Sequence, residues 1–429
     1  MKIRSIGITL LLLLTPAAAL DLPTRRPLRM ATLTELRSLA RERVGTEARL
    51  PLADPAAESI SSVSLEPAGS GRIPNYLRAF AVMPPGAKPF AHLFRTFIFG
   101  GTVPPELKLA MGLRIAQVTH SPYAAAHFER LLHATARGKE TLDRMRVTGK
   151  TTTAPRERAA LEYAEWLTRD VHGITDGRFA ATRRFFNDSQ LIELTMAVSF
   201  FNYFTRFCEA LNLPVEPWVL DGNSKPAIPP RLPEHTPPAR IGLVTDEEMK
   251  AVVSAEAASK DPATRNSGLG LAIANSQRAM LRVPDLQAAW RGYGTTVRTD
   301  SRIGRELQLQ ISLAVSMVNG CRYCIVHQVV GLRRLGVDPA RLVALRRDDS
   351  ALTPRELAAV SFARKITVDP GAATDADFAA LRREFGDYGA LEVLLQTCAF
   401  NFMNRFTDNL RLPSEDEAIE VYRGVFADK

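Results

Sequence analysis

The sequence predicts an all-α protein made of two tandem copies of one helical bundle. Apolar residues recur at helical spacing in both halves of the chain, and no stretch alternates in the way that a half-buried strand does. An ordered set of residues in the first half recurs in the second half, which indicates an internal repeat. At 429 residues the chain is also longer than a single core comfortably organises. We therefore expect two bundles joined by a connecting segment.

The first residues are typical of a secretory signal peptide. Lys2 and Arg4 give a short basic start, an apolar run covers Ile8 to Leu14, and the small residues Ala17 to Ala19 follow. The apolar run is shorter than the roughly 20 residues that a membrane-spanning helix needs, and no later stretch approaches that length. The pattern predicts an exported protein, periplasmic or secreted, with an uncleaved anchor as the alternative.

The repeat sets the predicted boundaries. Glu106 matches Glu306 at a spacing of 200 residues, and after a one-residue deletion Phe201–Phe207 matches Phe400–Phe406. The predicted segments are 1–19 (signal peptide), 20–70 (N-terminal segment with a helix from Leu33 to Val44), 71–217 (first copy), 218–245 (proline-rich linker), 246–415 (second copy) and 416–429 (C-terminal tail).

Several helices of the second copy have recognisable signals. Asp246 begins a helix that leads into the copy, and Thr353-Pro354 and Thr374-Asp375 are capped helix starts. The stretch from Glu306 to Val318 carries apolar residues on one face. Tyr388 to Phe406 is apolar almost all round, which predicts a buried central helix.

Composition argues against several classes of function. The formal net charge of +9 comes from scattered arginines, and no aromatic-and-basic module is present, so we expect no nucleic-acid partner. A glycine-rich phosphate-binding motif is absent from the sequence, and we expect no cofactor. Four cysteines are too few for a disulfide scaffold in a chain of this size, so a closely spaced pair suggests a site.

The stretch from Asn319 to His327 holds the residues with the clearest chemistry. Gly320 ends one helix and Cys321 opens the next, so its thiol lies at the positive end of a helix dipole, which stabilises a thiolate. Cys324 lies one turn further on, where the two sulfur atoms could cycle between dithiol and disulfide if they remain reachable by solvent. His327 follows on the same face, within reach for a proton relay.

The motif Asn-Gly-Cys-x-Tyr-Cys, with Tyr323 before the second cysteine, resembles the carboxymuconolactone decarboxylase and alkyl hydroperoxidase D-like superfamily. The resemblance covers roughly 70–215 and 270–415. It implies an all-α fold, a homo-oligomer, and reduction of a hydroperoxide substrate with a dithiol as reductant. In that scheme Cys324 attacks the peroxide as a thiolate, and Cys321 resolves the resulting sulfenic acid into a disulfide.

The chain departs from the peroxidase branch of that superfamily at two positions. The branch has a relay histidine four residues after the second cysteine, where this chain has Gln328. It has a glutamate twelve residues before the first cysteine, where this chain has Leu309. His327 and Glu306 are displaced from these positions, so we expect any proton relay to differ from that of the best-known members.

A structural ion pair is also predicted. Arg405 lies with Asn401 on the most apolar helix, and a buried arginine needs a carboxylate partner. Glu306 on another helix is the candidate, and Glu106 is the equivalent candidate for Arg206.

The first copy has Ser121 and Ala124 in place of the two cysteines, although it keeps His127. Neither replacement can form a disulfide, so we expect this copy to support the assembly or to bind something without redox chemistry. Cys208 and Cys398 lie in apolar helices and are expected to be buried thiols.

Other interpretations remain open at this point. A structural zinc site would need further ligands that the spacing does not supply, whereas a static disulfide would suit an oxidising compartment. The whole chain could also be a non-redox decarboxylase-like enzyme that uses acid–base groups such as His127, or a non-catalytic oligomeric scaffold.

Overall fold

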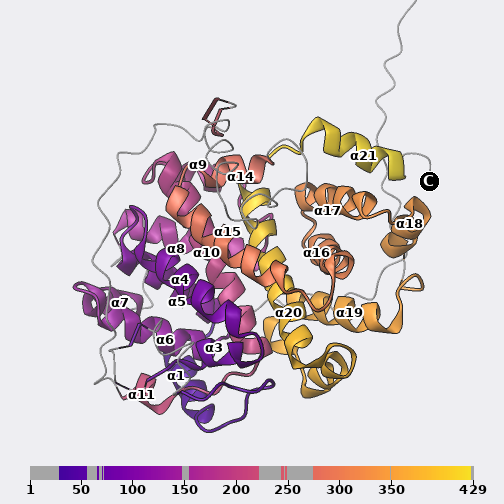
Figure 1. Cartoon of the computed structure of the whole chain (residues 1–429). Helices are drawn as coiled ribbons and strands as arrows, with labels where there is room; N and C mark the ends of the chain where they lie inside the picture. Colours follow the sequence, from indigo (N-terminus) through magenta and orange to yellow (C-terminus); the bar gives the residue numbers. More distant parts are fainter. Residues whose placement is uncertain are drawn as a thin grey trace, which may run out of the picture.

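Helices are the only regular secondary structure among the residues that the structure describes (Figure 1). The computed structural model describes residues 29–55, 65–66, 70, 72–146, 154–221, 243–245, 247–248, 274–347 and 349–426. The all-α prediction is therefore confirmed. Within the described ranges, every helix is too short or too polar to span a bilayer. The predicted signal peptide, most of the proline-rich segment and most of the helix expected from Asp246 lie outside the described residues.

The helices follow one another in two similar series. The first series is α1 (Leu33–Glu42), α3 (Asn75–Arg78), η1 (Ala79–Val82), α4 (Pro84–Phe99), α5 (Pro105–Thr119), α6 (Pro122–His133), α7 (Gly138–Arg146), α8 (Pro155–Arg169), α9 (Asp176–Arg183), α10 (Asp188–Ala210) and α11 (Pro217–Leu220). The second is α14 (Asn275–Met280), α15 (Pro284–Thr299), α16 (Arg305–Asn319), α17 (Arg322–Arg334), α18 (Pro339–Arg347), α19 (Pro354–Val368), η2 (Pro370–Ala372), α20 (Asp375–Asn409) and α21 (Asp416–Phe426). Proline opens many of them, because its missing N–H and fixed φ suit the first helical position.

The predicted helix starts are found where the sequence placed them. The side chains of Thr353 and Thr374 each accept a hydrogen bond from the backbone N–H of the third residue of their helix. In return, the backbone N–H of each threonine donates to the side-chain carboxylate of that third residue. Helix α20 is broken at Gly386, whose φ of 67° no other residue adopts readily. The buried stretch predicted from Tyr388 onward is the part of α20 that follows this break.

Two of the predicted boundaries fall at helices of the structure. The linker was expected to begin at residue 218, but residues 217–220 form α11, which packs on α6. The tail was expected from residue 416, but α21 covers this stretch and packs against α17 and α18. The apolar residues Ala418 and Val425 hold α21 in place, because both are buried.

The two halves share one hydrophobic core rather than forming separate bundles. Helix α10 packs along α20, and α4 packs along α15, so the longest helices of each half meet in the middle of the molecule (Figure 1). Trp290 stacks on Phe402 with ring centroids 3.9 Å apart. The hydroxyl groups of Tyr203 and Tyr293 lie 2.6 Å apart across the same contact. Separating the halves would expose these rings to water, which is costly.

Matching residues make matching contacts across this interface. Arg206 donates to the backbone carbonyl of Thr367, and Arg405 donates to the backbone carbonyl of Thr168, both at 3.4 Å. Each arginine therefore reaches from its own half into the other. Such reciprocity is what two similar units need when they meet through the same surface patch.

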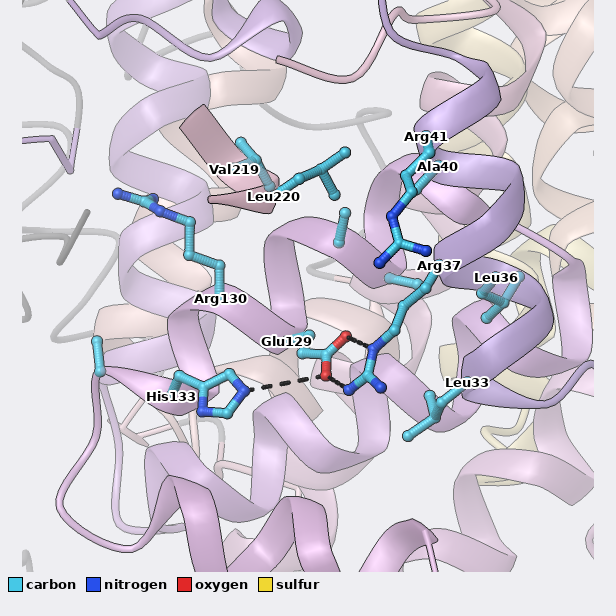
Figure 2. Close-up of a pocket in the computed structure, with 13 residues that line it drawn as sticks. Leu33, Leu36, Arg37, Ala40, Arg41, Glu129, Arg130, His133, Val219 and Leu220 are labelled. Atoms are coloured by element: carbon cyan, nitrogen blue, oxygen red, sulfur yellow. Dashed lines mark hydrogen bonds and ion pairs between the residues drawn. The ribbon is translucent and has the colours of Figure 1, made fainter. Parts of the chain in front are cut away.

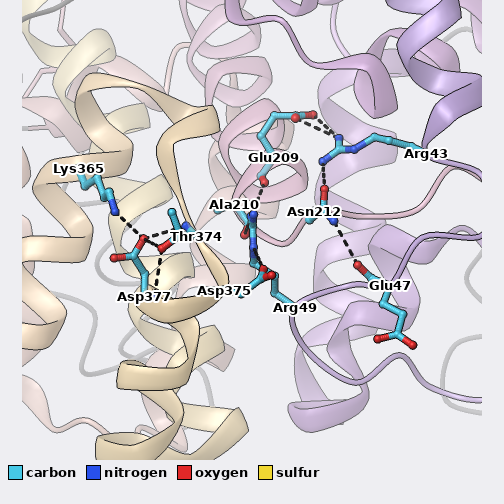
Figure 3. Close-up of polar contacts among 10 residues, drawn as sticks. All are labelled: Arg43, Glu47, Arg49, Glu209, Ala210, Asn212, Lys365, Thr374, Asp375 and Asp377. Carbon is cyan, nitrogen blue, oxygen red and sulfur yellow. Dashed lines mark hydrogen bonds and ion pairs between the residues drawn. The ribbon is translucent and has the colours of Figure 1, made fainter.

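The N-terminal segment ties the halves together from outside (Figure 3). Arg49 donates to Asp375 at the start of α20 at 2.8 Å and to the carbonyl oxygens of Glu209 and Ala210 at 3.2 and 2.8 Å. Arg43 donates two further bonds of 3.0 Å to the Glu209 carboxylate. The two carbonyls belong to the last turn of α10, where backbone acceptors have no partner within the helix.

A buried glutamate organises the loop before α5 and its counterpart before α16. Glu193 accepts hydrogen bonds from the backbone N–H groups of Thr102 and Val103, at 2.8 and 3.1 Å. Glu392 accepts the equivalent bonds from Arg302 and Ile303, at 2.7 and 3.2 Å. These carboxylates therefore fix the entry of the helix that ends at the candidate site.

The side chain that donates to this buried glutamate differs between the two halves, and the difference leads to a prediction about stability. Lys108 Nζ lies 2.9 Å from Glu193, whereas Gln308 Nε2 lies 2.9 Å from Glu392. We expect Lys108→Leu to lower the free energy of unfolding by about 3 kcal/mol or more, because it leaves the buried Glu193 carboxylate with neither a counter-ion nor a side-chain donor at that position. Lys108→Gln should cost about 1 kcal/mol, since it copies the second half. Urea denaturation of both variants measures the two free energies of unfolding. Equal losses in the two variants would contradict the role that we assign to the Lys108–Glu193 contact.

Candidate functional site: a buried cysteine pair

The cysteine pair lies at the junction of α16 and α17. Gly320 ends α16 in the left-handed conformation with φ of 71°, and Cys321 is the residue that precedes the first turn of α17. Cys324 lies in that first turn. Both sulfur atoms are 3.3 Å from the hydroxyl oxygen of Thr407 on α20. The predicted position of the pair at the start of a helix is confirmed, and the two thiols point to the same hydroxyl group instead of pointing apart.

The two thiols have opposite electrostatic surroundings. Burial raises the pKa of Cys321 above that of an ordinary thiol, and its hydrogen bond to Cys324 raises the pKa further. Burial acts in the same direction on Cys324, but hydrogen bonds from Cys321, Thr407 and Asn404 and the charge of His327 outweigh it. The pKa of Cys324 is therefore lowered. The arrangement favours a thiolate on Cys324 beside a neutral thiol on Cys321.

The expectation that solvent reaches both sulfur atoms is wrong for this chain. Cys321 is 0 % exposed and Cys324 is 3 % exposed. The cause is α20, which covers the pair and also supplies the Thr407 hydroxyl. Both residues are free thiols here, and so are the buried Cys208 and Cys398.

His327 is held by acceptors on both of its ring nitrogens. Nε2 lies 2.6 Å from Oε2 of Glu415, and Nδ1 lies 2.7 Å from the backbone carbonyl oxygen of Tyr323. Burial alone would lower the pKa of His327, but these two bonds and the charge of Glu415 outweigh it, so the pKa is raised. A carboxylate and a carbonyl can only accept, so the ring donates to both as an imidazolium. His327 thus supplies positive charge to the thiol site.

Glu415 is a residue of this site that the sequence analysis missed. Burial raises its pKa, but the hydrogen bonds from His327 and the backbone N–H of Asn275 outweigh burial, and the pKa is lowered. It also accepts from the Tyr323 hydroxyl at 3.2 Å. Glu415 follows the repeated Leu-Pro pair by two residues, as Glu216 does in the first half. The glutamate that recurs two residues after each Leu-Pro pair is the sequence feature that identifies Glu415.

The first half keeps the same arrangement without the cysteines. His127 Nε2 lies 2.9 Å from Glu216, and the Tyr123 hydroxyl donates to the same carboxylate at 2.8 Å. Burial raises the pKa of Glu216, but the charge of His127 and the hydrogen bonds outweigh it and lower the pKa. The His–Glu–Tyr arrangement is therefore common to both halves.

In the first half, other residues occupy the positions of the two cysteines. Ser121 replaces the first cysteine and donates to Glu209 at 2.7 Å, and Ala124 replaces the second. Burial raises the pKa of Glu209. The residue that matches Thr407 is Cys208, whose pKa burial also raises well above the ordinary thiol value. Cys208 therefore has no second cysteine in the first half with which it could form a disulfide.

The predicted ion pair between Glu306 and Arg405 is wrong. Glu306 lies at the exposed start of α16 and pairs with Arg341 at 3.1 Å. Arg405 is buried and donates to the carbonyl oxygen of Asn401 at 3.0 Å, besides its bond to the other half. The start of α16 points to α18 rather than to the interface between the halves.

The equivalent pair in the first half is wrong as well. Among the described residues, no ion pair joins Glu106 to Arg206. Arg206 donates to the carbonyl oxygen of Asn202 at 3.1 Å. Asn202 and Asn401 each donate to a threonine hydroxyl of their own half at 2.8 and 2.9 Å. These asparagines and arginines stabilise the interface and do not contact the thiols.

A histidine of the first half lies close to residues that flank the cysteine pair. His172, between α8 and α9, lies 2.7 Å from Asp408, the residue after Thr407. A Cβ atom at Gly320 would lie 2.8 Å from the His172 ring, and the left-handed conformation of Gly320 also favours glycine. In the described part of the chain, no three His, Cys, Asp or Glu side chains gather as metal ligands.

Removing the shared hydroxyl tests the electrostatic description of the pair. In Thr407→Val we expect the pKa of Cys324 to rise, because a donor to its thiolate is lost. Thr407→Ser keeps the hydroxyl and serves as the control. Ultraviolet absorbance of the thiolate, followed against pH, measures the change. An unchanged titration in the valine variant would show that Thr407 does not stabilise the thiolate.

Known proteins resemble only parts of the chain. No curated protein is significantly similar to the chain. Among solved structures, the debrominase Bmp8 in its apo form is similar with 20 % identity and a TM-score of 0.38, over 43 % of this chain and 97 % of that chain. A variant of the same debrominase in complex with 2,3,4-tribromopyrrole gives 20 % identity, a TM-score of 0.37, and 43 % and 96 % coverage. Residues 284–365, which include both cysteines of the pair and His327, match the model of the carboxymuconolactone decarboxylase family.

Proposed function

We propose that the second half of the chain is a thiol-dependent peroxidase that reduces hydroperoxides through Cys324 and Cys321. The observation that carries the proposal is the difference between the two thiols, because the pKa of Cys324 is lowered and that of Cys321 is raised. A peroxidatic cysteine must react as a thiolate, and its resolving partner must lie close by.

The reaction would proceed in two steps at these residues. The Cys324 thiolate attacks one peroxide oxygen, the O–O bond breaks, and the leaving alkoxide or hydroxide takes up a proton. This step oxidises Cys324 to a sulfenic acid. The Cys321 thiol then attacks the sulfenic sulfur, an S–S bond forms and water leaves. An external dithiol must return both cysteines to the reduced state.

The surroundings of the pair support this assignment. Thr407 Oγ1 lies 3.3 Å from both sulfur atoms, and its hydrogen bond to Cys324 acts to lower the pKa of that thiol. The imidazolium of His327, which Glu415 holds in place, provides a positive charge near the thiolate without being consumed. Because only 3 % of Cys324 is exposed, small peroxides should react faster than bulky ones.

A peroxide titration of the full chain tests the proposal. The reduced protein should consume hydrogen peroxide continuously with dithiothreitol present. Without dithiothreitol, peptide mass analysis should detect a disulfide between Cys321 and Cys324. Cumene hydroperoxide is the bulky comparison and should react more slowly. A protein that gains this disulfide but never turns over would favour a static disulfide, and one that stays reduced would contradict redox chemistry.

We infer further that the first half is a second copy of the same family fold that has lost its cysteines. The matching His–Glu–Tyr contacts and the reciprocal arginine contacts support this inference. On the N-terminal pattern we also propose that the protein is exported. N-terminal sequencing of the mature protein tests the cleavage expected after residue 19.

A further inference from the structure

A cavity of about 530 Å³ lies in the first half (Figure 2), and neither Cys321 nor Cys324 lines it. Helices α1, α6 and α11 line it. Tyr123, His127 and Glu216 are not among the residues that line the cavity. Its volume is in the range of small-molecule sites.

The wall of the cavity combines an apolar surface with arginine side chains. Leu36, Ala126 and Val219 are buried residues from the three helices and give the apolar part. Arg37 and Arg41 come from successive turns of α1 and give the charged part. A ligand that fits must therefore present both an apolar body and a polar group.

The charges on the wall do not cancel. Arg37 is paired with Glu129 through a bond of 2.9 Å, and a second bond joins the same two groups. Arg130 is paired with Glu66 at 2.7 and 2.6 Å. The guanidinium of Arg41 has no hydrogen-bond or ion-pair partner among the described residues. One positive charge is thus left over at the cavity.

The placement of this charge points to an anion. Figure 2 shows the Arg41 side chain directed to the Arg37 side of the cavity, with the Arg37–Glu129 pair beside it. Arg37 and Arg41 are four residues apart on one helix, where like charges repel. An anion placed by Arg41 would remove this repulsion and gain a charge-assisted hydrogen bond.

We propose that this cavity binds a small organic carboxylate whose apolar body lies against α6 and α11 and whose carboxylate pairs with Arg41. A cation would face an uncompensated arginine, and a neutral molecule would leave that arginine without a partner. The site is independent of the thiol chemistry, because none of its residues contacts the cysteine pair.

Isothermal titration calorimetry of the full chain with octanoate tests the proposal. We expect saturable binding of octanoate, and 1-octanol, which has the same tail without the charge, should bind at least tenfold more weakly. Arg41→Glu should weaken octanoate binding at least tenfold, whereas Arg41→Lys should retain most of it. Arg41 is exposed, so its replacement should leave the melting temperature unchanged.

The outcomes separate this proposal from the proposed function. Cys324→Ser should bind octanoate like the unmodified chain. If octanoate does not bind, or if it binds equally well to Arg41→Glu, the carboxylate site is refuted while the peroxidase proposal stands. If 1-octanol binds as tightly as octanoate, the cavity selects apolar molecules and not anions, which also overturns the proposal.

Discussion

Replacing Cys324 with serine is expected to lower peroxide turnover on the order of 10³-fold or more, because the attacking thiolate is removed. The pKa of Cys324 is the one that its surroundings lower, so we expect no other cysteine to take over. The rate is measured as hydrogen peroxide consumption with dithiothreitol. A variant that keeps most of its rate would assign the chemistry to another group.

Cys321→Ser should separate the two steps of the reaction. Its Cys324 should still be oxidised once, because the hydroxyl of Thr407 and the His327 charge remain. Turnover should fail, since no second thiol can form the disulfide. Trapping the sulfenic acid with dimedone and measuring the mass of the protein would detect this single oxidation. Disulfide formation in this variant would show that a different cysteine resolves Cys324.

The buried cysteine of the first half offers a matched control. Cys208→Thr places in the first half the residue that the second half has at Thr407. The change should leave peroxide turnover unaltered, because burial raises the Cys208 pKa and no second thiol is its neighbour in that half. A large loss of rate in this variant would mean that the first half takes part in the chemistry.

The second large effect is expected from Glu415→Gln. Glu415 holds His327 as a cation, and that cation lowers the pKa of Cys324. Without the carboxylate we expect the pKa of His327 to fall and that of Cys324 to rise. The rate of peroxide consumption at neutral pH should drop roughly tenfold, and its pH profile should shift to higher pH. An unchanged pH profile would show that His327 and Glu415 do not control the pKa of Cys324.

Glu216→Gln is the control for this change, because it removes the same carboxylate from the half without cysteines. It should leave the pH profile of peroxide consumption unaltered. Both variants should lose stability, by about 1–3 kcal/mol, since each loses a charge-assisted hydrogen bond. The loss should be larger for Glu216, whose side chain is 6 % exposed, than for Glu415, which is 16 % exposed. Urea denaturation measures both values.

The pH dependence of stability follows from the direction of the two pKa shifts. The pKa of His327 is raised in the folded state, so its contribution is full below the ordinary histidine value and is lost as pH rises through the folded value. The pKa of Glu415 is lowered, so its contribution is full above the ordinary glutamate value and is lost as pH falls through the folded value. The pair therefore stabilises the protein most between the ordinary pKa values of the two groups. Glu415→Gln should remove this maximum.

Local features of the chain were predictable from the sequence because they depend on residues three or four positions apart. The capping threonines Thr353 and Thr374, the break between α16 and α17 at Gly320, and the helix start at Cys321 are all of this kind. Their hydrogen bonds form within one turn, so the sequence alone specified them.

Partners across the fold could not be predicted in the same way. Thr407 and Glu415 lie 83 and 88 residues from Cys324 and His327, and nothing in the local pattern of α17 names them. The pairing of Glu306 with Arg405 was wrong because a buried arginine requires acceptors, and backbone carbonyls of the opposite half serve as well as a carboxylate.

The sequence by itself determined the helical fold, the internal repeat and the position of a cysteine pair at the start of a helix. Only the tertiary structure decided that the two halves share one core, that α20 buries the pair, and that a histidine–glutamate ion pair lies beside it. Helix signals act over a single turn of chain, whereas burial and the pKa shifts it causes depend on which distant helix packs against that turn.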